Sequence, residues 1–251
     1  MESDERGPQQ VLVVGGINAD VTVSSERRAR PGETVVGDGP IWSPGGKGAN
    51  IAAAAARAGA NVTMCGAVGD DPLGQVQVNA LLEAGVGVDA IRVSAGQATG
   101  VALIVVTPDG ENSITVGAGA NLTVGPEDLA AAGEYDVMLV QSEIGAATAD
   151  AAVAVAASTH SRVVLSLAPV SELEPITWQR ADPLVVNRDE AGDVLALFGR
   201  TAPDDPEVLT VAVREVSGVA SVVISLGAEG CVVGSHEGTV HVPAVPTKVV
   251  D

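Results

Sequence analysis

Basic residues and aromatic residues are both scarce in this 251-residue sequence. The 13 Lys and Arg side chains face 32 Asp and Glu side chains, and the formal net charge at pH 7 is -19. A nucleic-acid-binding protein needs a basic face for the phosphates, so this balance excludes a nucleic-acid partner. An excess of carboxylates also predicts a stability that rises in molar KCl, because salt screens their repulsion. Hydrophobic residues make up 46% of the chain, which is ample material for a large core.

Long apolar runs and cysteine pairs are missing as well. No run reaches the roughly 18 apolar residues that a membrane span needs. The segment Met1–Gln10 is acidic and polar, the reverse of a secretory leader. We therefore expect a cytoplasmic protein with no membrane partner. Cys65 and Cys231 lie far apart, which favours buried free thiols over a redox pair or a zinc site.

Short β-rich runs alternate with Ala-rich helical stretches along most of the chain. This pattern is typical of a mostly parallel sheet with helices on both faces. The predicted strands are Val11–Val14, Val62–Cys65, Val137–Gln141, Val163–Leu167, Leu184–Val186 and Ser221–Leu226. The predicted helices are Ala49–Ala58, Leu73–Ala84, Ala147–Ala157, Glu190–Phe198 and Glu207–Val216. We predict one α/β domain over residues 1–251, built as a three-layer sandwich.

Two stretches break this alternation. Val21–Val36 and Gly100–Val116 alternate Thr and Val around the turn signals Pro31-Gly32 and Asp109-Gly110, without a helix. We interpret them as strands of a small separate sheet, at about residues 19–43 and 97–118. Such a sheet would lie over the carboxyl ends of the core strands, where open α/β folds bind ligands, and act as a lid. An antiparallel extension of the main sheet is the alternative.

The first strand runs into the polar sequence Gly15-Gly16-Ile17-Asn18-Ala19-Asp20. The GxGxxG spacing of a dinucleotide site is absent. Asn18 and Asp20 alternate in a strand-like segment, so their side chains are expected on the same face. An amide beside a carboxylate can donate to and accept from adjacent hydroxyls, as a polyol requires. A polar turn without a ligand is the alternative.

A second motif, Pro44-Gly45-Gly46-Lys47-Gly48-Ala49-Asn50, leads into a predicted helix. It fails the Walker pattern, because Gly48 follows Lys47 where Ser or Thr is required. Glycines at a helix start let a ligand approach the backbone N–H groups, and Lys47 and Asn50 add polar groups. The alternative is a tight glycine-rich turn with a solvated lysine.

Six segments in a fixed order carry a family resemblance. They are GGINAD (15–20), RPGET (30–34), GGKGAN (45–50), GDDPLG (69–74), TGVALIVV (99–106) and AGAN (118–121). From about Val11 to Asp251 the chain resembles the ribokinase-like branch of the carbohydrate-kinase superfamily. The resemblance implies transfer of the γ-phosphoryl group of MgATP to the primary hydroxyl of a pentose, with ribose at O5 expected. It also implies a homodimer that pairs the lids of two subunits.

For the sugar, the resemblance implies a site made by Asn18, Asp20, Gly46, Lys47, Asn50 and Glu143. Two carboxylates, two amides and an ammonium can bind several hydroxyls without an aromatic platform. Glu143 follows a predicted core strand, a position that favours a site residue, and a solvated loop carboxylate is the alternative.

For the nucleotide, the resemblance assigns Asn187 to the phosphates and Glu190 to the water shell of magnesium. Helix capping by these two residues is an alternative that is compatible with both roles. The resemblance further implies a nucleotide-binding turn at Ser225, Leu226, Gly227, Ala228, Glu229 and Gly230, for which a simple β-turn is the alternative. Asp251 matches a position that helps to hold a monovalent cation, usually potassium.

The sequence departs from the family pattern in two places. Ser166-Leu167-Ala168-Pro169 stands where an Asn-Pro-Ala-Pro run is usual. The sequence ends at Asp251, and the family's next element, a glycine-rich GAGD sequence that supplies the anion hole and the catalytic aspartate, is not among its residues. A general base contributes about 10²- to 10⁴-fold, so the polypeptide as printed is expected to be nearly inactive.

Two explanations of this ending stay open. Either a C-terminal part covers the sheet beyond Asp251, which is favoured because the apolar surface would otherwise be exposed, or the chain is a non-catalytic sugar-binding remnant. Within the enzyme class, a kinase for another sugar or for a nucleoside is the alternative.

Overall fold

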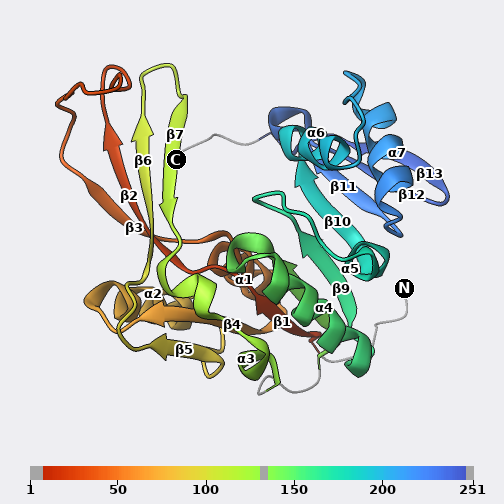
Figure 1. Cartoon of the computed structure of the whole chain (residues 1–251), viewed down its shortest axis with the longest axis horizontal. Helices are drawn as coiled ribbons and strands as arrows, with labels where there is room; N and C mark the ends of the chain where they lie inside the picture. Colours follow the sequence, from red (N-terminus) through yellow and green to blue (C-terminus); the bar gives the residue numbers. More distant parts are fainter. Residues whose placement is uncertain (1–7, 131–134, 247–251) are drawn as a thin grey trace. The chain divides into compact units, whose positions relative to one another are not determined.

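The computed structural model describes residues 8–130 and 135–246 and divides into two compact units, Met1–Gly133 and Glu134–Asp251. Each unit combines parallel strands with helices, as Figure 1 shows. The expected α/β class, with mostly parallel core strands and an additional small sheet, is confirmed. Within the described ranges, no helix combines the length and apolar character needed to cross a membrane.

The first unit contains a parallel core and a separate small sheet. Its elements are β1 (Gln10–Val14), β2 (Asn18–Ser24), β3 (Ile41–Gly45), α1 (Lys47–Arg57), β4 (Asn61–Gly69), α2 (Pro72–Glu83), β5 (Ile91–Ser94), β6 (Gly100–Val106), β7 (Asn112–Gly117), a 3-10 turn (Gly119–Thr123) and α3 (Pro126–Ala130). Strands β1, β4 and β5 pair in parallel, and α1 packs on β1 and β4. Leu12, Val14 and Met64 are fully buried there, because strands covered by helices need apolar side chains on both faces.

The small sheet has the order β3-β2-β6-β7 and extends away from the β1-β4-β5 core in Figure 1. Strand β2 pairs in parallel with β6, and the outer pairs are antiparallel. The Asp109-Gly110 turn closes the β6–β7 hairpin as predicted, with Gly110 at φ 83°. The sheet is separate from the core strands of its unit, so the alternative of a main-sheet extension is wrong.

The second unit has one sheet in the order β13-β12-β11-β10-β9-β8. Its elements are β8 (Val137–Gln141), a 3-10 turn (Ser142–Ile144), α4 (Ala146–Thr159), β9 (Arg162–Ser166), α5 (Pro175–Arg180), β10 (Ala181–Asn187), α6 (Arg188–Leu197), α7 (Pro206–Ser217), β11 (Val222–Ser225), a 3-10 turn (Gly227–Glu229), β12 (Cys231–Ser235) and β13 (Gly238–Val242). Strands β8 to β11 are parallel, so their carboxyl ends meet at one edge.

Some predicted boundaries were wrong. Most of Val21–Val36 is not strand: β2 ends at Ser24, and β3 begins only at Ile41, near the end of the expected range 19–43. Residues between Ser25 and Pro40 form an exposed loop, in which Arg27 makes a two-point ion pair with Glu33 at 2.6 Å. This loop is rich in charge, Pro and Gly, which pair poorly in strands. Helix α1 begins at Lys47 rather than Ala49, because Gly46 takes the N-cap position.

The two cysteines are both free, as expected, but only one is buried. Cys65 lies on β4 with no exposed surface, whereas Cys231 on β12 is half-buried. Burial raises the pKa of the Cys65 thiol to about 12, and the nearby Asp128 carboxylate adds to the effect.

Candidate active site

Strand β2 places two of the predicted sugar-binding side chains on one face. Asn18 and Asp20 are two residues apart in the strand, so both side chains project to the same side, as predicted. In the antiparallel pairing with β3, Asn18 lies opposite Gly45 and Asp20 lies opposite Ser43. Asn18 is buried and Asp20 half-buried, so this face offers an amide held in the protein and a carboxylate closer to solvent.

Asn121 fixes the approach to this strand. Its Nδ2 donates to Asn18 Oδ1 at 2.7 Å and to the carbonyl of Ile17 at 3.2 Å, while its Oδ1 accepts from the Ile17 N–H at 2.8 Å. The sequence showed Asn121 only as the last letter of AGAN, and no site role was predicted for it. With its Oδ1 already accepting from Asn121, the Asn18 amide keeps its Nδ2 donors for a ligand.

The glycines of the GGKGAN segment allow its backbone to pack closely on other parts of the first unit. A Cβ on Gly45 would overlap the Asp20 carboxylate, and one on Gly48 would come within 2.7 Å of the Gly15 carbonyl carbon. Gly46 has φ 92°, where a Cβ would lie 2.6 Å from the Asn18 N atom. The sequence predicted that these glycines allow a ligand to approach closely. In the structure, they allow other parts of the first unit to approach. They let the two polar motifs pack backbone against backbone.

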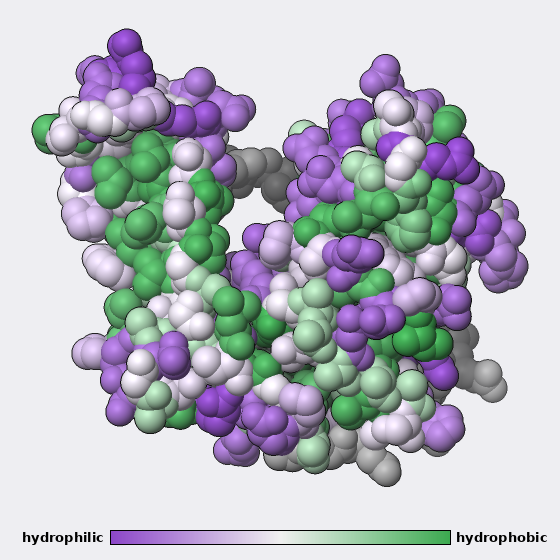
Figure 2. Space-filling view, in the orientation of Figure 1, coloured by the Kyte–Doolittle hydropathy of each residue, from purple (hydrophilic) through white to green (hydrophobic). Residues whose placement is uncertain are grey.

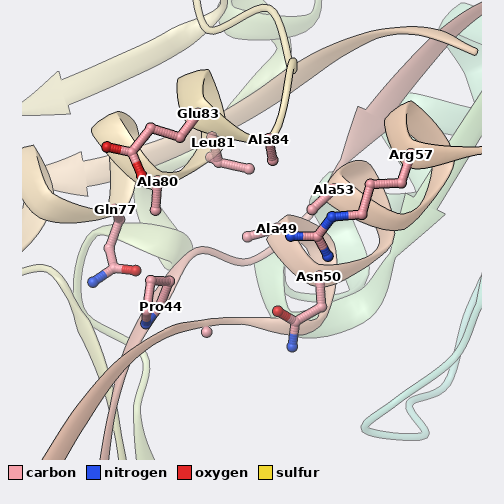
Figure 3. A pocket seen from close by; sticks show the side chains of 11 residues that line it. Pro44, Ala49, Asn50, Ala53, Arg57, Gln77, Ala80, Leu81, Glu83 and Ala84 are labelled. Carbon is pink, nitrogen blue, oxygen red and sulfur yellow. The ribbon is translucent and has the colours of Figure 1, made fainter. Parts of the chain in front are cut away.

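Helix α1 carries the remaining predicted sugar contacts of the first unit. Lys47 is its first residue and is exposed, next to the buried Gly46. Asn50 lies one turn further and lines a cavity of ≈ 740 Å³ together with Pro44 and Gly45 (Figure 3). Asn18, Asp20 and Lys47 are not among the residues that line this cavity.

Asp71 links the start of β6 to the start of α2 by hydrogen bonds. Its Oδ1 caps the helix by accepting from the Gly74 N–H at 2.9 Å, and its Oδ2 accepts from the Thr99 N–H at 2.8 Å. Burial raises the pKa of this carboxyl, but the hydrogen bonds from Thr99 and Gly74 outweigh it and hold the pKa below its ordinary value. These contacts join the GDDPLG and TGVALIVV segments.

In the second unit, Glu143 lies in the 3-10 turn directly after β8, at the strand end where it was predicted. Its backbone N–H donates to the side chain of Gln141 at 3.2 Å, and the Gln141 amide donates to the Ala168 carbonyl at 2.6 Å. Ser142 Oγ donates to the Pro169 carbonyl at 2.8 Å. The residues that replace the family's Asn-Pro-Ala-Pro run are thus held directly against the turn that carries Glu143.

Asn187 and Glu190 form a capping box at the start of α6. The Asn187 N–H donates to Glu190 Oε2 at 2.8 Å, and the Glu190 N–H donates to Asn187 Oδ1 at 2.8 Å. The capping interpretation is confirmed, and it remains compatible with a ligand. Glu190 Oε1 and Asn187 Nδ2 make no hydrogen bond to the described parts of the chain. Glu190 is half-buried, and Asn187 is exposed.

The predicted nucleotide turn is the connection between β11 and β12. Ser225 ends β11 and lies beside Asn187 in the parallel pairing with β10. The turn closes through the Leu226 N–H, which donates to the Gly230 carbonyl at 2.8 Å, and it contains a 3-10 turn over Gly227–Glu229. Gly227 and Gly230 have φ 60° and 95°, the left-handed region that favours glycine. The turn interpretation is confirmed, and residues 227–229 are exposed at the strand edge that also carries Asn187.

The structure thus groups the predicted residues in two places. Asn18, Asp20, Gly46 and Lys47 gather where β2 meets the start of α1. Asn187, Glu190 and the turn 225–230 gather at the carboxyl ends of β10 and β11. Asp251 lies outside the described residues. Within the described ranges, no group of three or more His, Cys, Asp or Glu side chains is arranged to hold a metal ion.

A parallel α/β core, a small additional sheet and polar groups at strand ends are features of small-molecule enzymes of the open α/β class. The chain belongs to the pfkB family of carbohydrate kinases, whose model matches residues 8–251.

Similar proteins include the ribokinase of Bacillus subtilis, 34% identical over 247 residues, which cover 97% of this chain and 80% of that relative. Among solved structures, the ribokinase of Thermotoga maritima has a TM-score of 0.82 at 26% identity. The match covers 97% of this chain and 80% of the Thermotoga chain. The structure of Arabidopsis thaliana ribokinase is a complex with ribose and ATP. It has a TM-score of 0.83 at 26% identity, and the match covers 98% of this chain and 80% of that chain.

Proposed function

We propose that this protein is an ATP-dependent sugar kinase that transfers the γ-phosphoryl group of ATP to O5 of D-ribose. The observation that carries the proposal is the convergence of Asn18 and Asp20 on β2 with the glycine-rich start of α1. Similarity to ribokinases over nearly the whole chain supports ribose as the acceptor, and the Arabidopsis relative binds ribose and ATP.

The proposed sugar site uses groups of complementary hydrogen-bonding character. The Asp20 carboxylate accepts from two hydroxyls, and the Asn18 Nδ2 donates to a hydroxyl oxygen while Asn121 occupies its Oδ1. Lys47 contributes a cation at the helix start. Asn50 and Glu143 complete the proposed set. Because each of these groups is polar, the site selects a small polyol without aromatic stacking.

The proposed nucleotide site lies in the second unit. Asn187 directs its Nδ2 to the phosphates, and the turn 225–230, which is exposed at residues 227–229, lets the backbone lie against the nucleotide. The donor set also fits magnesium. One oxygen of Glu190 is used in the capping box and the other remains for a metal-bound water, which suits an ion that commonly keeps several waters. Magnesium would neutralise charge on the transferred phosphoryl group. A potassium site that includes Asp251 is part of the proposal.

We also infer that the small sheet closes over the sugar and pairs two subunits. Its face that carries Asp20 also carries Ile41 and Ile114, whereas the other face carries Trp42 and Leu103. All four apolar side chains are more than half exposed, and Figure 2 shows apolar residues gathered over this sheet. A sheet with exposed apolar residues on both faces can cover a ligand with one and a second copy with the other. Closure would keep water away from the phosphoryl group.

The test is an ADP-coupled assay with a panel of sugars and nucleosides. D-ribose should be among the best acceptors, with activity that needs magnesium and rises with potassium. Ribose among the poorest acceptors, with a nucleoside or hexose preferred, would assign another substrate within the family.

Calorimetry beside the coupled assay separates binding of ribose and ATP from phosphoryl transfer. Ribose binding with no ADP formation would favour a sugar-binding regulator.

A further inference from the structure

A cavity of ≈ 740 Å³ in the first unit lies between α1, α2 and strand β3 (Figure 3). Pro44 lines it and lies opposite Ala19 in the β2–β3 pairing. Neighbouring strand residues point to opposite faces, so Pro44 projects away from the face that carries Asn18 and Asp20. The part of the cavity at Pro44 is therefore on the other side of the small sheet from Asn18 and Asp20, whereas Asn50, another proposed sugar contact, lines the cavity itself. Its size is within the range of small-molecule sites.

Gln77 of α2 is the first indication of a ligand. The residue as a whole is 3% exposed, it lines the cavity, and its amide makes no hydrogen bond within residues 8–130 and 135–246. The amide atoms themselves are not buried, so they are open to the cavity. Figure 3 shows the amide at the end of a side chain that reaches toward Pro44 and the open space. An amide that faces a cavity offers both a donor and an acceptor to a bound molecule. A polar ligand in the cavity would pair it.

The second indication is the placement of charge. Arg57 lies in the last turn of α1 and Glu83 in the last turn of α2, and both line the cavity. They form no ion pair with each other or with any other side chain that the structure describes. In Figure 3 the guanidinium lies near Asn50, whereas the Glu83 carboxylate lies on the α2 wall with Gln77. One wall thus offers donors to an anion, and the opposite wall offers acceptors to a cation.

The surface between these polar groups is aliphatic. It consists of Ala49, Ala53, Ala80, Leu81 and Ala84. No aromatic ring lines the cavity, so stacking with a nucleobase is not provided. Charges of opposite sign across an aliphatic floor match a molecule with an acid group, an ammonium group and an aliphatic body.

We propose that this cavity is a binding site for a small aliphatic zwitterion of the amino-acid type. Its carboxylate binds Arg57 and the Asn50 amide, its ammonium binds Glu83, and the Gln77 amide pairs with either polar group. A purely anionic ligand would be opposed by Glu83, and a purely cationic one by Arg57.

Calorimetric titration of the 251-residue chain with L-leucine, in the absence of sugar and nucleotide, tests the proposal. Two analogues each lack one charge: 4-methylpentanoate has no ammonium, and 3-methylbutylamine has no carboxylate. L-leucine should bind at least about tenfold more tightly than either analogue, since each lacks one charged contact. No binding of L-leucine up to roughly 10 mM, or equal binding of one analogue, would overturn the proposal.

Substitutions connect the binding to the cavity. R57Q and E83Q change exposed side chains, so both should fold normally and weaken L-leucine binding about tenfold each. R214Q, at the arginine in the last turn of α7, is the matched control and should bind as the unchanged protein does. Unchanged affinity in both R57Q and E83Q would place the ligand elsewhere and overturn the proposal.

Gln77 provides an independent readout. Q77L removes an amide that makes no hydrogen bond within the described residues, so the unfolding midpoint should change little while L-leucine binding weakens. A lower midpoint with unchanged binding would show that Gln77 has a structural role only, and would count against the site.

A regulatory consequence rests on the proposed function. Gly45 and Asn50 line the cavity, and Gly45 also contacts the Asp20 carboxylate. L-leucine should therefore change the affinity for ribose, and ribose should change the affinity for L-leucine by the same factor. The titration without sugar is independent of kinase activity, so a failure of the ribose assignment would leave the binding result intact.

Discussion

Asn121 Nδ2 donates a hydrogen bond of 2.7 Å to Asn18 Oδ1, across 103 residues of sequence. Both side chains are buried, and Gly100 lies so close to both amides that a Cβ there would overlap them. The bond fixes which end of the Asn18 amide remains for a ligand. Asn121 is therefore a positioning residue for the proposed sugar site.

Replacing Asn121 by alanine should weaken ribose binding about tenfold or more, because the Asn18 amide is then free to rotate. The free energy of unfolding should fall by about 1–3 kcal/mol, since the Ile17 N–H loses its buried acceptor. Ribose and ATP titrations by calorimetry measure the first effect, and thermal unfolding measures the second. N112A, at an exposed asparagine of β7, is the control. A loss of stability without a loss of ribose affinity would restrict Asn121 to a structural role.

Gly45 should be intolerant of a single added methyl group. G45A places a Cβ where the Asp20 carboxylate now lies, so the carboxylate must move and ribose affinity should fall about tenfold or more. G39A is a matched control, because a Cβ on Gly39 meets no atom within 4 Å. D20A should remove most ribose binding by itself and leave ATP binding nearly intact. If G45A and D20A both bound ribose normally, Asp20 would not be a sugar ligand.

Glu190 allows helix capping to be separated from magnesium binding. Gln can replace Glu in a capping box, so E190Q should keep the free energy of unfolding within about 0.5 kcal/mol. E190A should lose about 0.5–2 kcal/mol, the usual range for a lost cap. If Glu190 orders the magnesium water shell, both variants should need more magnesium for half-maximal ATP binding. Magnesium titrations that match the unchanged protein in E190Q would leave Glu190 with its capping role alone.

Local patterns in the sequence predicted much of the fold and the local geometry of several candidate site residues. Side chains two residues apart in a strand point to the same side, so Asn18 and Asp20 share a face of β2 wherever the strand lies. Asn187 and Glu190 are three residues apart at a helix start, and this spacing is enough to form the capping box. Both features depend on neighbours in sequence. The loop before β3 was missed because its second Thr-Val run, at 34–36, resembles a strand, yet surrounding charges and glycines leave it unpaired.

Long-range relationships could not be predicted in this way. The bond from Asn121 to Asn18 joins segments that only the folded chain brings together, and AGAN gives no local sign of it. The glycines at 45 and 48 similarly suggested an approaching ligand, while the atoms that approach include Asp20 and the backbone of Gly15. A sequence shows that space is needed at a glycine, but the fold decides what occupies it.

The two thiols should differ strongly in reactivity. The pKa of Cys65 is raised to about 12 by burial, so only about one molecule in ten thousand carries the thiolate at pH 8. Cys231 is half-buried and accessible to reagent. Titration of the folded chain with an aromatic disulfide reagent should release one equivalent quickly and the second only on unfolding. C231S should abolish the fast phase, whereas a fast phase that persists in C231S would show that Cys65 opens to solvent.

Salt should stabilise the fold through the excess of carboxylates. With a formal net charge of -19 at pH 7, repulsion among the acidic side chains opposes the compact state, and added ions screen it. The thermal unfolding midpoint should therefore rise between 0.05 and about 2 M KCl, with most of the rise below about 0.5 M, where the screening length shortens most. The control is the same titration near pH 4.5, where more carboxylates are protonated and the rise should be smaller. A midpoint that is independent of KCl at pH 7 would show that the acidic surface does not limit stability. An equal rise at both pH values would instead point to a general effect of salt on apolar burial.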